Sequence, residues 1–426
     1  MKTLKRILII SANPLSDASN NGKTIASFFD SYPKELIAQL YFYPTAPSSE
    51  VCDNYFRISD MDMVKSRFCG STQCGTHITE GRAGAESSED IEQTKKVRKN
   101  NFSRLMREFL WNENWKTQEL EKWLDVFEPE LIFFVAGDAW FSYRITLYIR
   151  KKYHTKLAVF ITDDYILPRL TVSIFWWLRR NVLYKYMKKI LNICDVFFTI
   201  SPAMRKKYYE IFGVDSYTAV NMPELSADKA LAASETKKDT FLLLHTGSLH
   251  SNRDKTLALL AKAIDEINAS KVLGKRVVLE MYSYHDLDLR KRKKLEIEGS
   301  SVWGGYLPQE ELERKFQEAD GLVYAESFEY KSVHNMLLSL STKIPEYMML
   351  KKPIIAVGSD KISAIQYLSD CACCITKKSE MRRELYYYLK NTVLQKEHVE
   401  KAYHKYLIDY DKQKRQKEFL EILQKV

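Results

Sequence analysis

The clearest candidate for chemistry lies within residues 341–358 of the chain. A polar turn of Ser341, Thr342 and Lys343 precedes a short helical pattern that carries Glu346, and an apolar strand follows at residues 354–357. Backbone N–H groups at a helix start are unpaired and carry partial positive charge, so this turn predicts a site for an anion such as a diphosphate. Glu346 is an acceptor suited to ribose hydroxyls. The alternative is a capped surface helix before a core strand.

A second candidate follows the apolar strand predicted at residues 241–245. Gly247 and Ser248 come directly after this strand, and Arg253 and Lys255 lead into a helical pattern. Gly247 lets the backbone approach a phosphate closely, and Arg253 can make a forked, charge-assisted contact. A solvated surface charge is the alternative for Arg253. This turn therefore predicts a second phosphate contact.

The first part of the chain begins with a similar unit. Residues 6–11 form a short, continuous apolar run, as expected for a buried parallel strand, and a turn-rich loop with Gly22 and Lys23 separates it from a helical pattern that starts at Ile25. Strand, loop and helix together predict the first unit of a doubly wound fold. With one glycine in the loop, neither a dinucleotide fingerprint nor a P-loop is complete.

Two adjacent carboxylates follow another predicted strand. Asp163 and Asp164 come after residues 157–161, and ligands of open α/β sheets bind beyond the carboxyl ends of the strands. The pair could hold an acceptor hydroxyl or stabilise developing positive charge. Capping of a helix N-terminus is the equally supported alternative.

These motifs resemble the retaining glycosyltransferases of the GT-B fold that act in bacterial capsule, lipopolysaccharide or exopolysaccharide synthesis. The resemblance is carried by the pattern Ser-x-Lys-x-x-Glu-Tyr-x-x-x-x-Lys-Pro, which begins at Ser341. It is extended by the turn after residue 245 and by Gly-x-hydrophobic-Pro-x-x-Glu-hydrophobic over residues 305–312. It implies an α/β fold of two facing Rossmann-like domains with a cleft between them. The implied activity is transfer of a sugar from a nucleotide-diphosphate sugar to a hydroxyl acceptor.

The resemblance also implies roles for particular residues. Glu326, after the strand predicted at residues 319–324, would approach the donor sugar, and Tyr306 follows glycines that edge the base in the family. Two departures stand out: Asp163 replaces a histidine that many relatives have, and Leu338 occupies the position of the first glutamate of the usual pair. The candidate sets are catalytic Asp163, Asp164 and Glu326; donor-binding Gly247, Ser248, Arg253, Lys255, Tyr306, Ser341, Thr342, Lys343 and Glu346; and, in an acceptor-side loop, Gly22 and Lys23.

The domain organisation follows from the polar stretch in mid-chain. A chain of 426 residues fits two domains of about 200 residues each. We expect an N-terminal, acceptor-side Rossmann-like domain at 1–222, a linker at 223–240 and a C-terminal nucleotide-sugar-binding domain at 241–400. Residues 401–426 are expected to form a helix that returns to the first domain, as in the resembled family.

Three other segments give local expectations. Residues 45–100 lack clear periodicity and predict an irregular insertion that shapes the acceptor side. Apolar residues at helical spacing over residues 102–127, Phe109 among them, predict a core-facing helix with a break near residues 112–114. Residues 171–190 combine aromatic side chains with five basic residues. This combination fits an interfacial helix on an anionic membrane, and equally a helix with one buried and one solvated face.

Composition and charge bound the partners. The formal net charge of +10 favours anionic partners, and we expect a nucleotide sugar, a glycan or lipid-linked acceptor and an anionic membrane surface, but no nucleic acid. No signal peptide or spanning segment is evident, so we expect a cytoplasmic protein, with a peripheral place on the inner face of the cytoplasmic membrane as an open alternative.

No cofactor or metal is expected beyond the donor substrate. Cys69, Cys74 and His77 resemble a metal site superficially, but a fourth ligand is not evident, and seven cysteines without a secretion signal do not indicate disulfides. Two rival functions remain open: a sugar-nucleotide epimerase of the same fold, and a non-catalytic binding protein.

Overall fold

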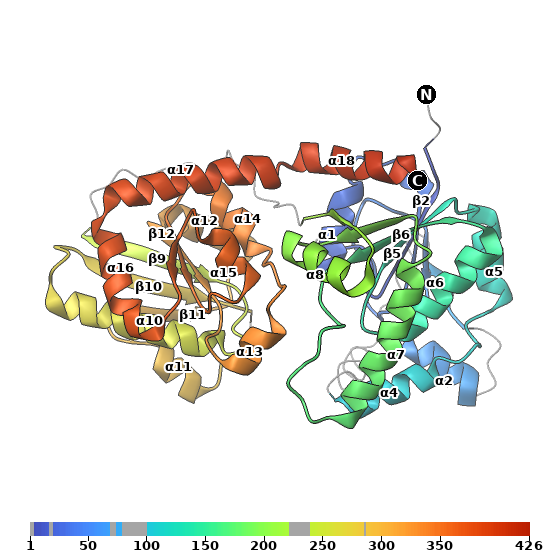
Figure 1. The fold of residues 1–426 in the computed structure, drawn as a ribbon, viewed down its shortest axis with the longest axis horizontal. Coiled ribbons are helices and arrows are strands. Elements are labelled where there is room, and N and C mark those ends of the chain that lie inside the picture. The colour runs from blue at the N-terminus through green and yellow to red at the C-terminus, as the bar shows by residue number, and fades with distance from the viewer. Residues whose placement is uncertain (1–3, 17–19, 69–73, 79–99, 221–238, 285–286) are drawn as a thin grey trace. The chain divides into compact units, whose positions relative to one another are not determined.

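Two doubly wound α/β units make up the chain. The computed structural model describes residues 4–16, 20–68, 74–78, 100–220, 239–284 and 287–426. The first unit comprises Met1–Val220 with Gln413–Val426, and the second comprises Asn221–Lys412 (Figure 1). The linker expected at 223–240 lies almost entirely outside the described residues.

The first unit is built on an eight-stranded sheet with the order β4-β3-β2-β1-β5-β6-β7-β8. All neighbouring strands run parallel except β3 and β4. Every residue of β1, β2 and β5 is buried, as continuous apolar runs covered by helices on both faces require. The strands are β1 Ile7–Ser11, β2 Ile37–Tyr41, β3 Tyr55–Arg57, β4 Thr76–Ile78, β5 Leu131–Val135, β6 Lys156–Ile161, β7 Val196–Thr199 and β8 Tyr217–Thr218.

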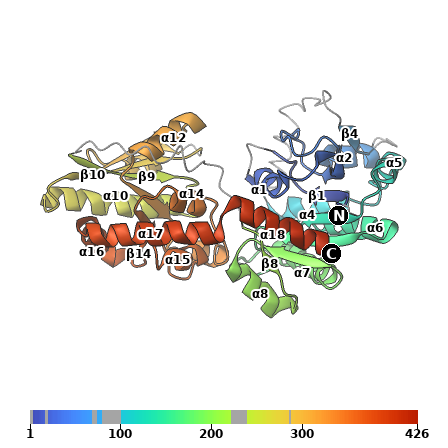
Figure 2. The same ribbon diagram turned by 90° about the horizontal axis from the view of Figure 1, so that it is seen from above.

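The helices of this unit follow the alternating pattern of the strands. They are α1 Asn20–Phe29, α2 Asp60–Phe68, α4 Asn101–Leu110, α5 Gln118–Phe127, α6 Trp140–Tyr153, α7 Ile174–Leu191 and α8 Pro202–Phe212, with α18 Lys412–Lys425 from the end of the chain. Phe419 of α18 stacks on Phe28 of α1 with 4.7 Å between ring centroids, and Gln416 donates to the carbonyl of Ser27. These contacts bind α18 to the first unit (Figure 2).

Two local expectations for this unit were wrong. The irregular insertion expected at residues 45–100 contains β3, α2 and β4 in its described part; strands of three residues are too short to show alternation in the sequence. Phe109 of α4 was expected in the core but is 60% exposed, whereas Arg107 and Glu108 are buried. Arg107 Nε bonds Asp60 at 2.7 Å and Glu108 accepts from the Trp140 and Phe141 N–H groups at 3.1 Å, so polar contacts set the orientation of the helix.

The second unit has a six-stranded, fully parallel sheet with the order β11-β10-β9-β12-β13-β14. Its strands are β9 Thr240–Thr246, β10 Arg276–Tyr282, β11 Ser301–Gly305, β12 Gly321–Ala325, β13 Ile354–Val357 and β14 Cys373–Ile375. The strand order reverses between β9 and β12. In doubly wound sheets such a reversal marks the crevice where ligands bind, outside the carboxyl ends of the strands.

The helices of the second unit cover both faces of this sheet (Figure 1). They are α10 Arg253–Ser270, α11 Leu289–Leu295, α12 Gln309–Glu318, α13 Tyr330–Asn335, α14 Lys343–Met349, α15 Ser363–Leu368, α16 Met381–Lys390 and α17 Thr392–Asp409. Residues 401–409, which we expected in a returning helix, are part of α17 and belong to the second unit. Among the described residues, no helix combines the length and apolar character that crossing a bilayer requires.

Candidate functional site

The turn between β9 and α10 lies at the carboxyl end of the central strand of the second unit. Gly247 has φ +148°, a conformation that residues with a Cβ rarely adopt, and no atom lies within 4 Å of where its Cβ would be. Its N–H donates to the carbonyl of Tyr282 at 3.1 Å. The turn therefore presents backbone that no side chain covers at the point where the strand order reverses.

Arg253, the first residue of α10, makes a forked ion pair with Glu326. Its Nε lies 3.1 Å from Glu326 Oε2 and its terminal nitrogen lies 2.8 Å from Oε1. Glu326 directly follows β12 and is 1% exposed, and the hydroxyl of Tyr324 donates to it at 2.6 Å. The buried carboxylate therefore fixes the direction of the guanidinium at the β9–β12 edge.

Gly358, after β13, makes room for this carboxylate. A Cβ at Gly358 would lie 2.7 Å from Glu326 Cβ and 3.1 Å from its backbone, and φ is +157°. This role was not foreseen from the sequence. The signal was a glycine directly after the buried strand at residues 354–357, where parallel strands end side by side.

The start of α14 is held against the same edge. Lys343 Nζ lies 2.7 Å from Glu346 Oε2, and the Lys343 N–H donates to Ser341 Oγ at 3.3 Å. Tyr347 Oη accepts from the Thr246 N–H at 3.1 Å and donates to the Thr246 carbonyl at 3.2 Å. This double contact clamps α14 to the end of β9, so Lys343 and Glu346 come close to the Gly247 turn.

His245 lies close enough to Arg253 and Lys343 for both charges to act on it, and it was not foreseen from the sequence. It is buried, and its Nδ1 lies 2.9 Å from the Val323 carbonyl. A carbonyl only accepts, so Nδ1 carries the hydrogen and Nε2 is an unprotonated acceptor. Within the part of the chain that the structure describes, Nε2 meets no hydrogen-bond donor. Burial, together with the charges of Arg253 and Lys343, lowers the pKa of His245 to about 4, so the imidazole is neutral at pH 7.

The other four donor-side candidates are described by their positions in the second unit. Ser248 Oγ accepts from the His250 N–H at 3.2 Å, and Thr342 is exposed directly before α14. Lys255 is exposed in the first turn of α10, where its charge acts on Glu329. Tyr306 is exposed after β11, two strands away from β9. These four assignments stay predictions.

The carboxylates of the first unit differ from each other. Asp164 accepts from the N–H groups of Ile166 and Leu167 and from the hydroxyl of Tyr208, each at 3.1 Å, so it holds the loop after β6. It does not cap a helix, because α7 begins only at Ile174 and is capped by Ser173. Asp163 is exposed, although the surrounding protein desolvates its carboxyl group enough to raise its pKa. Asp163 is therefore the more available of the two for a ligand.

Gly22 and Lys23 lie in the first turns of α1, not in the preceding loop. The helix begins earlier than the sequence suggested because Gly22 packs onto the loop: a Cβ there would lie 2.3 Å from the Pro14 carbonyl. Gly22 thus serves the close approach of helix and loop. Lys23 is half-buried beside it, and its acceptor-side role stays a prediction.

A metal centre finds no support in the described residues. They contain no group of three or more His, Cys, Asp or Glu side chains placed to hold an ion. Cys69 of the candidate set lies outside the described residues. Cys74 is buried, and burial raises the pKa of its thiol to about 12.

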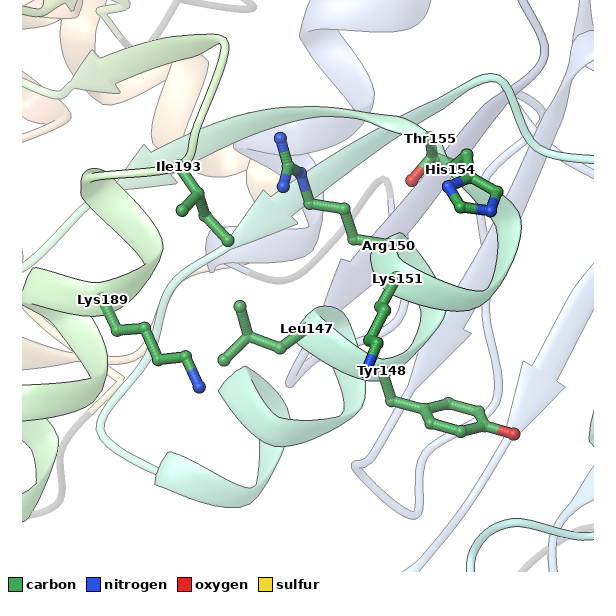
Figure 3. Close-up of a pocket in the computed structure, with 8 residues that line it drawn as sticks. All are labelled: Leu147, Tyr148, Arg150, Lys151, His154, Thr155, Lys189 and Ile193. Atoms are coloured by element: carbon green, nitrogen blue, oxygen red, sulfur yellow. The ribbon is translucent and has the colours of Figure 1, made fainter.

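A cavity of about 650 Å³ lies elsewhere in the first unit (Figure 3). Leu147, Arg150 and Lys151 of α6 line it with Lys189 of α7. Thr155, also in its wall, directly precedes β6, so the cavity lies at the amino edge of the sheet. The candidate residues lie at the carboxyl edges, and the cavity therefore has no part in their site.

The comparisons with known proteins give a fold but no family. No protein-family model matches the chain, and no curated protein is similar to it in sequence. Among solved structures, Anabaena Alr3699/HepE in complex with UDP and glucose has a TM-score of 0.60 at 10% identity, covering 99% of this chain and 100% of that one. A glycosyltransferase from Rickettsia africae has 0.59 at 13%, covering 99% of each chain. The α,α-trehalose 6-phosphate synthase of Burkholderia multivorans has 0.61 at 12%, covering 99% and 97%.

The chain has the GT-B fold. The predicted α/β class with two Rossmann-like domains is thereby confirmed. At these identities the likeness concerns the fold alone, so what the chain does must be argued from its own residues.

Protonation of His245 gives a testable dependence of stability on pH. The folded protein keeps this side chain neutral down to about pH 4, whereas the unfolded chain protonates it near pH 6.5. The folded state therefore loses stability as pH falls from about 6.5 to 4, by up to about 3 kcal/mol.

In His245→Asn, whose amide can still donate to Val323, thermal or urea unfolding should show a shallower loss of stability over this pH range. His154→Asn, at an exposed left-handed position, is the matched control and should keep the wild-type slope. An unchanged slope in His245→Asn would contradict the assignment.

Proposed function

We propose that the protein is a glycosyltransferase that moves a sugar from a nucleotide-diphosphate sugar to a hydroxyl acceptor. The observation that carries this proposal is that Arg253 and Lys343 both lie close enough to the neutral His245 for their charges to act on it, at the point where the strand order of the second unit reverses. Two fixed cations beside bare glycine backbone form a binding site for a diphosphate.

The diphosphate would lie on the Gly247 turn. Arg253 and Lys343 neutralise its charge, and the start of α10, an 18-residue helix whose N-cap residue provides no side-chain cap, adds partial positive charge. Glu346 accepts from ribose hydroxyls. Donor binding then replaces the Lys343–Glu346 ion pair with one contact to phosphate and one to ribose.

The same cations serve the reaction. As the bond between the anomeric carbon and the diphosphate breaks, negative charge grows on the leaving group, and positive groups already fixed in place stabilise it without reorganisation. Arg253 is well suited because Glu326 holds it before substrate arrives. Two such cations are the basis for proposing that no metal is obligatory. His245, neutral at pH 7, offers Nε2 to a hydroxyl or N–H donor.

The finer assignments rest on the resemblance described above. We propose a retaining reaction in bacterial surface polysaccharide assembly, with a glycan or lipid-linked acceptor at the inner face of the cytoplasmic membrane. Asp163 is our candidate to hold the acceptor hydroxyl. Glu326 is proposed to act near the donor sugar by positioning Arg253.

A thermal-shift panel tests the proposal. The purified protein is heated with a set of sugar nucleotides, with free nucleotide diphosphates and monophosphates as controls, because a ligand of the folded state raises the melting temperature. We expect protection by a subset of sugar nucleotides and by the matching diphosphate, and weaker protection by the monophosphate. Release of nucleotide diphosphate with an acceptor extract then separates a transferase from an epimerase, which converts the sugar without releasing the nucleotide. No protection by any nucleotide would refute the proposal.

A further inference from the structure

Helix α4 of the first unit exposes an apolar face and buries polar side chains. Phe102, Met106 and Phe109 are spaced as one helical face, and all three are exposed by about half or more, whereas Arg107 and Glu108 point into the protein and are buried. The polar contacts of Arg107 and Glu108 described above fix this orientation. Burial raises the pKa of Glu108 to about 8. A helix that buries polar side chains and exposes its phenylalanines needs a partner for that face.

The start of α7 repeats the inversion beside it. Arg179 is buried and bonds the carbonyl of Asp138 at 2.9 Å, while Val172 and Ile174 are 100% and 72% exposed. Phe175 of α7 and Phe102 of α4 touch edge to face with centroids 5.1 Å apart. The two helices pack together at one end of the unit, next to α2 (Figure 1). The Phe102–Phe175 contact joins the exposed apolar side chains of the two elements, which we call the α4–α7 apolar patch and define by Phe102, Met106, Phe109, Val172, Ile174 and Phe175.

The charge around this patch selects its partner. Near the start of α7 the basic residues Arg169 and Arg180 flank the patch in sequence, and residues 165–194 contain no acidic residue. On the α2 side, Arg67 bonds the carbonyl of Phe109 at 3.0 Å. The neighbouring carboxylates are already paired, Asp60 with Arg107 and Asp138 with Arg104 and Arg179. The patch is thus apolar and aromatic with a basic border.

We propose that the α4–α7 apolar patch is the surface on which the protein docks to an anionic lipid bilayer. An outward-facing surface of two helices suits a fluid interface, where phenylalanine and isoleucine enter the acyl boundary and basic residues meet the headgroups. Trp177, whose indole N–H donates to the Thr171 carbonyl at 3.1 Å, lies at the same helix end and suits the headgroup level. This inference rests on the proposed function, because a lipid-linked acceptor is what would require the protein to bind a membrane.

The position of the patch fits this use. Asn101 at the start of α4 bonds Ser173 before α7 at 3.3 Å, and Arg104 bonds Asp138, which follows β5, at 3.2 Å. The loop from β6 to α7 carries Asp163 at one end and Val172 near the other. A bilayer on the patch would therefore lie along the loop that holds the acceptor-side candidate.

Vesicle flotation with the full chain tests the docking surface. The test variant is Phe102→Ser/Phe109→Ser/Ile174→Ser, and the matched control is Val272→Ser/Leu289→Ser/Val393→Ser, which removes comparably exposed apolar side chains from the second unit. With vesicles of about one-third phosphatidylglycerol, we expect wild type and control to float and the test variant to bind at least about tenfold more weakly. Neutral phosphatidylcholine vesicles and high salt should weaken wild-type binding.

Other outcomes would overturn the inference. Two of them are flotation of the test variant equal to that of the wild type, and no flotation of the wild type. The third is a wild type that is a dimer in gel filtration and does not bind vesicles, with a monomeric test variant; that result would assign the patch to contact with a second copy of the chain. If the triple variant melts markedly earlier than wild type, the single Ile174→Ser variant replaces it. Nucleotide protection in the thermal-shift panel is measured on the wild type and on every variant. Its absence in the wild type would count against the proposed function, whereas a wild type that is protected by a nucleotide but does not float counts against the docking surface alone.

Discussion

Arg253→Ala is expected to lower turnover by about a hundred- to a thousandfold and to destabilise the fold at the same time. The loss of turnover follows because one fixed positive group at the leaving diphosphate is removed. The loss of stability follows because Glu326, 1% exposed, keeps a buried charge without its partner, which costs about 3–5 kcal/mol. Nucleotide release and urea unfolding measure the two effects separately.

A double variant distinguishes the two roles of Arg253. In Arg253→Ala/Glu326→Gln the buried carboxylate becomes neutral, so we expect much of the stability to return while turnover stays low. Arg292→Ala is the matched control, because Arg292 and Glu296 form an exposed pair at 2.9 Å in the same unit; it should change stability by no more than about 0.5 kcal/mol. If the double variant regained turnover together with stability, Arg253 would serve the fold only.

Lys343→Ala and Glu346→Ala are expected to abolish measurable turnover while leaving the fold intact. The two side chains form a largely buried pair at the start of α14, with 29% and 20% of the side chains exposed, so breaking the pair should cost about 1–3 kcal/mol, which the fold should tolerate. Binding should suffer far more. Loss of the lysine charge should weaken the binding of a nucleotide diphosphate by about a hundredfold, and loss of the carboxylate should weaken it by about tenfold or more. Calorimetric titration with the diphosphate found in the panel measures both.

Lys377 and Glu380 provide the control for this pair. They are also three residues apart in the second unit, with Nζ and Oε1 separated by 3.3 Å, so Lys377→Ala and Glu380→Ala remove the same chemical groups outside the proposed site. Donor affinity should stay at the wild-type value in both. Near-wild-type donor binding in Lys343→Ala or Glu346→Ala would show that α14 is not part of the site.

The elements of the fold could largely be read from the chain because their signals are local. Continuous apolar runs at residues 131–135 and 354–357 are strands in the structure, and Ser201 before Pro202 caps α8 as its residue type suggests. Where the local signal was short or ambiguous, the prediction was wrong. Strands β3 and β4 have three residues each, and α4 shows a helical period that does not reveal which face is buried.

For the candidate site, the sequence by itself determined which polar groups flank buried strands: Arg253 after β9, Glu326 after β12, and Lys343 with Glu346 before β13. Only the tertiary structure decided their partners. Arg253 meets Glu326 across 73 positions, and Tyr347 meets Thr246 across 101. Burial under this strand order also makes His245 a neutral acceptor, whereas in the first unit the buried contacts of Arg107 and Glu108 turn the phenylalanines of α4 outward. The physical reason is that residue periodicity records which side chains share a face of one element, whereas partners, burial and pKa depend on which distant elements the sheet brings together.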